Sequence, residues 1–169
     1  MSLEGTIFIS HSSKDEPIVT AFVDKILTVG LGISREKIFY TSAKDTGIKS
    51  GTDFKQAIRD NMKNAVAVIQ IITSNYKESE ICLNEMGAAW VLSDNVIPFI
   101  MAGVRFDNIG FIHNMTQLLK LDSAEDLFKF QDDHDELYEG RRIKQSNYHK
   151  QVNEFIELIN GNGFRFRHY

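Results

Sequence analysis

The segment Ala65–Ile72, AVAVIQII, constrains the fold of this chain more than any other feature. An almost unbroken run of β-branched residues is typical of a parallel strand that is covered on both faces, so we place it at the centre of a sheet. Shorter β-rich runs at Thr6–Ser10, Ile38–Thr41, Val96–Met101 and Leu118–Leu121 predict the other strands. A sheet of five strands follows.

Helical patterns separate these strands, at Pro17–Val29, from the capping box Ser50–Asp53 to Lys63, at Ser79–Trp90 and at Tyr148–Ile159. In the first of them Ile18, Phe22 and Ile26 recur at four-residue spacing. We expect Asn75, with Glu78 three residues later, to cap the third helix and Trp90 to pack in the core. Strands that alternate with helices predict a doubly wound, flavodoxin-like α/β sandwich with a mostly parallel central sheet flanked by helices.

Composition limits the classes of protein that fit. The chain has 169 residues and a net charge of −4 with no basic block, which argues for one domain over 1–169 and against a nucleic-acid partner. No apolar run approaches the roughly 18 residues that span a bilayer, so no membrane association is expected. With Cys82 as its single cysteine, the chain fits a reducing, cytoplasmic setting. Residues 1–5 could be a cloning remnant.

The region 107–147 has a weak hydrophobic period and is predicted to be variable. Its run Asp132–Asp135 is expected to form a solvated face. A metal cluster is the alternative, but neighbouring residues on a helix or strand do not converge on one ion. No metal and no cofactor are therefore predicted.

In a doubly wound sheet, ligands bind outside the carboxyl ends of the strands. Three predicted strands end in hydroxyl-rich segments, at Ser10–Ser13, Thr41–Ser42 and Thr73–Asn75. Such residues also favour turns and caps, which explains any one segment alone. The three together indicate a polyhydroxylic ligand such as a sugar or a nucleotide. Ser10–Lys14 lacks the glycines and the phosphate-loop lysine of the common nucleotide-binding motifs.

Glu85 is out of place in the predicted helix Ser79–Trp90. Its neighbours three and four positions away are Ile81, Cys82, Ala88 and Ala89, and none of them is a cation. A carboxylate on an apolar stripe without a partner in its own helix is a candidate functional group.

These motifs together resemble the Toll/interleukin-1 receptor (TIR) domain family, particularly its bacterial members. Phe8–Asp15, FISHSSKD, resembles the first motif of the family, and Ile38–Phe54 resembles its second strand and variable "BB" loop. Ser79-x-x-Cys82-x-x-Glu85 resembles the motif that carries the catalytic glutamate. The resemblance covers residues 6–101 well and the remainder only through the last helix.

The resemblance implies functions in signalling and bacterial immunity. Many members cleave NAD+ between nicotinamide and ribose, leaving ADP-ribose or a cyclic form, and Glu85 would then be the catalytic carboxylate. NAD+ is here a substrate. Members commonly assemble before they cleave, so other copies of the domain, in a homo-oligomer or filament, are expected partners, with residues 44–50 as a lid or contact loop.

For an NAD+-cleaving enzyme, the predicted substrate-binding residues are His11, Ser12, Ser42, Phe54, Ser79 and Cys82, of which Phe54 matches an aromatic residue of the family. His11 could instead cap a turn, and Phe54 could anchor the second helix. Cys82 lies one helical turn before Glu85 and is expected on the same pocket wall. The chain departs from the family at Ile81, where bacterial members often carry Trp.

Two other functions stay open. The chain could be an interaction module that assembles without catalysis. It could also be a nucleoside deoxyribosyltransferase, a related α/β fold that uses a Glu, although no second acidic motif supports this reading.

Overall fold

The computed structural model describes residues 5–40, 54–104, 117–138 and 143–161. The helices and strands follow in the order β1 (Thr6–Ser10), α1 (Glu16–Ala21), η2 (Phe22–Gly30), β2 (Ile38–Tyr40), α2 (Phe54–Lys63), β3 (Ala65–Ile72), α3 (Ser74–Lys77), α4 (Glu80–Leu92), β4 (Val96–Ile100), β5 (Leu119–Lys120), α5 (Ala124–Asp133) and α6 (Gln145–Asn160). In the described part of the chain there are also three short 3₁₀ turns, namely η1 (Ser13–Asp15), η3 (Arg35–Lys37) and η6 (Asp135–Tyr138).

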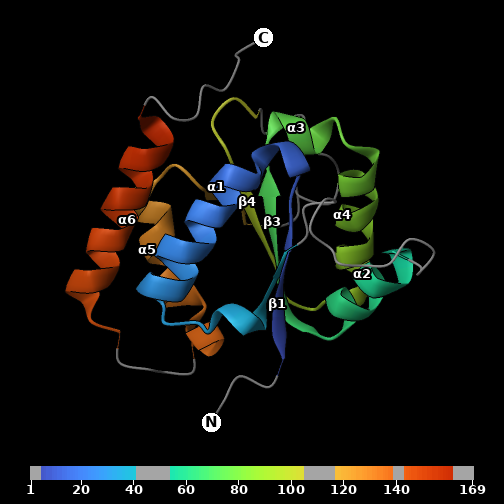
Figure 1. Cartoon of the computed structure of the whole chain (residues 1–169), viewed down its shortest axis with the longest axis horizontal. Coiled ribbons are helices and arrows are strands. Elements are labelled where there is room, and N and C mark those ends of the chain that lie inside the picture. Colours follow the sequence, from blue (N-terminus) through green and yellow to red (C-terminus); the bar gives the residue numbers. More distant parts are fainter. Residues whose placement is uncertain (1–4, 41–53, 105–116, 139–142, 162–169) are drawn as a thin grey trace.

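Within these residues the strands form one five-stranded sheet in the order β2-β1-β3-β4-β5. Every pairing is parallel, and β3 lies at the centre. This confirms the flavodoxin-like α/β fold and the central position predicted for Ala65–Ile72. Helices α1, α5 and α6 lie on one side of the sheet and α2, α3 and α4 on the other (Figure 1).

The face under α1, α5 and α6 is filled by a continuous apolar cluster. Ile18, Phe22 and Ile26, predicted from their spacing, are all buried in it. The Phe22 ring lies edge-on to Phe99 with centroids 5.3 Å apart, and Phe99 stands against Phe130 at 5.2 Å. This side of the sheet is a closed hydrophobic layer.

Two details of the helices differ from the sequence prediction. Ser79, not Asn75, caps α4, and its Oγ accepts a hydrogen bond from the backbone N–H of Cys82 at 3.3 Å. Asn75 lies inside α3 and donates to Asp15 Oδ1 at 2.6 Å, because the fold brings the β1 exit beside α3. Trp90, expected in the core, is 59% exposed, since α4 turns Cys82, Met86 and Ala89 toward the sheet instead.

The C-terminal part contains a helix that the sequence did not predict. Helix α5 begins after Ser123, whose Oγ accepts from the backbone N–H of Asp126 at 3.2 Å. Its apolar stripe was hard to detect because only Leu127 and Phe130 are buried apolar residues within it. Asp132, Asp133 and Asp135 are exposed, which confirms the solvated face.

Candidate active site

Glu85 receives its hydrogen bond from the end of the first strand. Ser10, the last residue of β1, donates from Oγ to Glu85 Oε2 at 2.6 Å. The carboxylate that lacks a partner in its own helix therefore has one elsewhere in the fold. Its own helix supplies none, and the donor comes from a residue 75 positions earlier that the parallel sheet places beneath α4.

A buried tyrosine extends this contact. The hydroxyl of Tyr76, in α3, lies 3.0 Å from Ser10 Oγ in hydrogen-bond contact. Tyr76 is fully buried and Ser10 is 1% exposed. Burial is the main cause that raises the pKa of Tyr76 far above its usual range, so this phenol stays neutral.

The carboxyl of Glu85 is half-buried, and burial raises its pKa above the usual value for glutamate. The hydrogen bond from Ser10 acts in the opposite direction because it stabilises the charged form. Among the described residues, no lysine, arginine or histidine forms an ion pair with Glu85. The neutral hydroxyl of Ser10 holds the carboxylate, so the negative charge of Glu85 is not cancelled.

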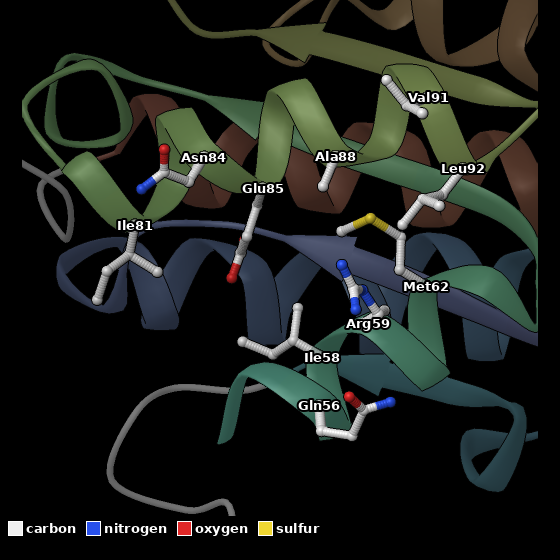
Figure 2. A pocket seen from close by; sticks show the side chains of 10 residues that line it. All are labelled: Gln56, Ile58, Arg59, Met62, Ile81, Asn84, Glu85, Ala88, Val91 and Leu92. Carbon is white, nitrogen blue, oxygen red and sulfur yellow. The ribbon is translucent and has the colours of Figure 1, made fainter. Parts of the chain in front are cut away.

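Beside Glu85 a groove of about 780 Å³ runs between α2 and α4. Its walls are mostly apolar, and its polar members are Gln56, Arg59, Asn84 and Glu85. Figure 2 shows the Glu85 side chain reaching from α4 toward α2, with the Arg59 guanidinium in the same groove. An apolar groove with a carboxylate and a guanidinium suits a ligand that carries rings and both signs of charge.

Of the residues predicted to bind substrate, Ser12 and Ser79 serve as caps. Ser12 is buried, and its Oγ accepts from the backbone N–H of Lys14 at 3.4 Å. Ser79 caps α4 through Cys82 N–H. Neither lines the groove. Ser42 and the side chain of Phe54 lie outside the described residues, as does the predicted lid at residues 44–50.

Cys82 lies beneath Glu85, away from the groove. Its side chain is buried, and Sγ lies 3.5 Å from the carbonyl oxygen of His11, to which the thiol donates. Burial raises the pKa of the thiol to about 11. A protonated, buried thiol is a poor nucleophile, which argues against a reactive role for Cys82.

His11 is 6% exposed and follows Ser10 at the β1 exit. Its Nδ1 lies 3.4 Å from the carbonyl oxygen of Ile9, and its Nε2 has no partner among the described residues. Burial lowers the pKa of the imidazole, so the ring is neutral near pH 7. A neutral ring that donates through Nδ1 leaves an acceptor at Nε2.

The sequence did not identify Ser10 and Tyr76 as residues that hold Glu85, nor Gln70 as a buried polar residue beside Ser10. Ser10 carried a signal, since it ends a predicted strand at the ligand-binding edge of the sheet. Gln70, in β3, pairs in register with Ser10 and is fully buried, yet both of its amide atoms lack partners among the described residues. Tyr76 carried no local signal, because its partner is 66 positions away.

The outer side of α4 exposes apolar side chains. Leu83, Trp90 and Val91 are 41%, 59% and 72% exposed, and they form what we call the α4 apolar strip, which reaches the groove at Val91. Exposed apolar residues gathered on one helix mark an interaction surface more often than scattered ones do.

In residues 5–40, 54–104, 117–138 and 143–161, no group of three or more His, Cys, Asp or Glu is arranged to hold a metal ion. None of the helices in that part of the chain combines the length and the apolar character needed to cross a membrane.

Comparisons with known proteins found a family model, a curated relative and a similar solved structure. A family model described as TIR domain matches residues 7–138. The chain is 38% identical over 130 residues to the uncharacterized protein YddK of Bacillus subtilis (strain 168), a match covering 77% of this chain and 48% of that protein. The chain thus spans about half the length of this relative. It is also similar to a chain in the structure of the activated Roq1 resistosome directly recognizing the pathogen effector XopQ (TIR domains), with a TM-score of 0.45 and 14% identity over 91% of this chain and 84% of that one.

Proposed function

The chain belongs to the TIR-domain family, and we propose that it cleaves NAD+ between nicotinamide and ribose with Glu85 as the catalytic carboxylate. One observation carries the proposal: Glu85 opens into an apolar groove, held by a neutral hydroxyl and paired with no cation of the described residues. A carboxylate in this setting attracts and stabilises positive charge that develops on a bound substrate.

The chemistry requires one carboxylate. When the bond between ribose C1′ and the nicotinamide nitrogen breaks, its electron pair stays with the nitrogen, so the cationic ring leaves as a neutral molecule and needs no general acid. The remaining positive charge spreads over C1′ and the ring oxygen, where Glu85 stabilises it. Water then bonds to C1′ and loses a proton, giving ADP-ribose. An internal nucleophile of the same product fragment would give a cyclic form.

The groove complements the rest of this substrate. Apolar side chains of Ile58, Met62 and Leu92 form its walls, against which a flat ring can pack. Arg59 forms no ion pair with a carboxylate of the described residues, and its guanidinium suits the pyrophosphate. The carboxylate and the guanidinium thus match a ligand with a cationic ring and an anionic linker.

The test is nicotinamide release from NAD+ by concentrated protein, followed by chromatography. Glu85→Gln should lower the rate on the order of 10²–10³-fold, the typical loss when one charge-stabilising group is removed. Glu80→Gln is the matched control, since Glu80 is exposed in the first turn of the same helix. It should keep the wild-type rate. Undiminished release by Glu85→Gln would remove Glu85 from the mechanism.

A second function is favoured by the α4 apolar strip, namely assembly with other copies of the domain without catalysis. Leu83, Trp90 and Val91 offer an apolar contact surface next to the groove. The release assay separates the two functions, because an interaction module would show no nicotinamide at any protein concentration. Both functions apply together if assembly with other copies activates NAD+ cleavage.

A further inference from the structure

The hydrogen bonds beneath Glu85 are all donated in the same direction, toward its carboxylate. Ser10 has one hydroxyl proton, and the bond to Glu85 Oε2 uses it whenever the carboxylate is ionised, since a carboxylate only accepts. The contact between Ser10 Oγ and the Tyr76 hydroxyl can then be made only with the Tyr76 proton. The order is therefore Tyr76 to Ser10 to Glu85.

We infer that Ser10 and Tyr76 are positioning residues, which fix one oxygen of the Glu85 carboxylate so that the other faces the groove and its ligand. The role of this positioning in catalysis rests on the proposed function, whereas the hydrogen bonds themselves do not depend on that function. Oε2 is committed to Ser10 at 2.6 Å, which leaves Oε1 for the substrate. Ser10 and Tyr76 are buried, so neither touches a ligand in the groove.

A chain of neutral hydroxyls suits a carboxylate that must keep its charge. Pairing with lysine or arginine would stabilise the carboxylate but cancel the charge that the cationic substrate meets. A hydroxyl polarised by a second hydroxyl stabilises the anion less and leaves its net charge intact. The two hydroxyls also fix the geometry of the carboxylate before the substrate binds, so the site reorganises less during the reaction.

Other titratable groups lie around this carboxylate. Tyr76 and Cys82 both feel the charge of Glu85, which raises the pKa of each beyond the effect of burial, and both are neutral near pH 7. Arg59 approaches from α2 across the groove. A change in the titration of Glu85 after substitution of Ser10 or Tyr76 is therefore not due to the loss of a charge.

The decisive measurement is the pKa of Glu85 itself, by NMR titration of protein with ¹³C-labelled glutamate, assigned with Glu85→Gln. Ser10→Ala should raise this pKa by about one unit, because the charged form loses its donor. Ser10→Thr keeps a hydroxyl and should restore the wild-type value. Tyr76→Phe should raise it by less, since Ser10 still donates but is no longer polarised.

Tyr148→Phe is the matched control for Tyr76→Phe. Tyr148 is also fully buried, and its hydroxyl donates to the carbonyl oxygen of Leu127 at 2.7 Å on the other side of the sheet. It should leave the pKa of Glu85 unchanged. An unchanged Glu85 pKa in Ser10→Ala overturns the inference, and an unchanged value in Tyr76→Phe removes Tyr76 from it.

Kinetic measurements with NAD+ test whether this positioning affects catalysis. Ser10→Ala should lower kcat about tenfold with little change in KM, because Ser10 does not contact the substrate. The acid limb of the kcat profile should move to higher pH in step with the NMR value, and Ser10→Thr should reverse both changes. If the wild type releases no nicotinamide, the proposed function fails, whereas the titration still decides whether Ser10 and Tyr76 hold the carboxylate.

Discussion

The two faces of the sheet are built from the same strands but in different ways. The face under α1, α5 and α6 holds one continuous apolar cluster in which Phe22 contacts Phe99, Phe130 and Phe155. The face under α2, α3 and α4 holds two smaller clusters, with a groove between α2 and α4. Buried polar side chains, among them Ser10 and Gln70, lie on this second face. We call the face under α1, α5 and α6 the closed face, and the face under α2, α3 and α4 the open face.

The difference follows from the period of a strand. Alternate residues point to opposite sides of a sheet, so Ile7 and Ile9 enter the closed-face cluster while Phe8 points to the open face and Ser10 reaches Glu85 beneath α4. A single strand can thus supply stability on one side and chemistry on the other. The division predicts that substitutions on the two faces have different consequences.

The largest expected effect is loss of stability on the closed face. Phe22→Ala should lower the free energy of unfolding by about 3–5 kcal/mol, because it removes a buried ring from a packed aromatic cluster. Trp90→Ala, on the exposed side of the open face, should change it by no more than about 0.5 kcal/mol. Urea denaturation followed by circular dichroism measures both. Similar losses in the two variants would show that the faces do not differ in this way.

An intermediate effect is expected on self-association. If assembly through the α4 apolar strip activates cleavage, specific activity should rise with protein concentration, and Trp90→Ala should need a concentration several-fold higher for the same activity. Val29→Ala is the control, because Val29 is an exposed apolar residue of η2, on the closed-face side. A dilution series of nicotinamide release measures this. Constant specific activity from dilute protein upward would show that one copy suffices.

The smallest expected effect is a pH-dependent gain in stability from Glu85→Gln. The folded-state pKa of Glu85 is raised above its unfolded value, so the folded protein favours the protonated form. Below the pKa of Glu85 in the unfolded state, the wild-type protein is therefore as stable as the uncharged variant. As the pH rises through the pKa of Glu85 in the folded state, the wild type loses stability relative to that variant. At pH 7.5 the variant should melt higher by on the order of 1–2 °C, allowing for solvent screening of a half-buried group.

Thermal denaturation at pH 7.5 and at pH 4 tests this sign. The difference between Glu85→Gln and wild type should shrink at pH 4, where the wild-type carboxyl is mostly protonated. Glu80→Gln should show no such change between the two pH values. A variant that melts lower than wild type at pH 7.5 would mean that the Ser10 hydrogen bond outweighs burial.

The sequence by itself determined most of the sheet. Ala65–Ile72 was identifiable as the central strand because a β-branched run of that length has one stable environment, a covered parallel sheet. The spacing of Ile18, Phe22 and Ile26 likewise identified the side of the first helical segment that is buried. Glu85 was identifiable as a functional candidate because its helix offers it no cation, which is a local property.

The tertiary structure alone decided which groups surround Glu85. Ser10 and Tyr76 reach the site from positions 75 and 9 residues earlier in the chain, and only the register of the parallel strands and the packing of α3 and α4 bring them together. The exposure of Trp90 was decided in the same way, because α4 carries apolar residues on every side and its periodicity does not reveal which side meets the sheet. Local patterns describe neighbours three or four residues apart, whereas hydrogen bonds and burial depend on neighbours in space.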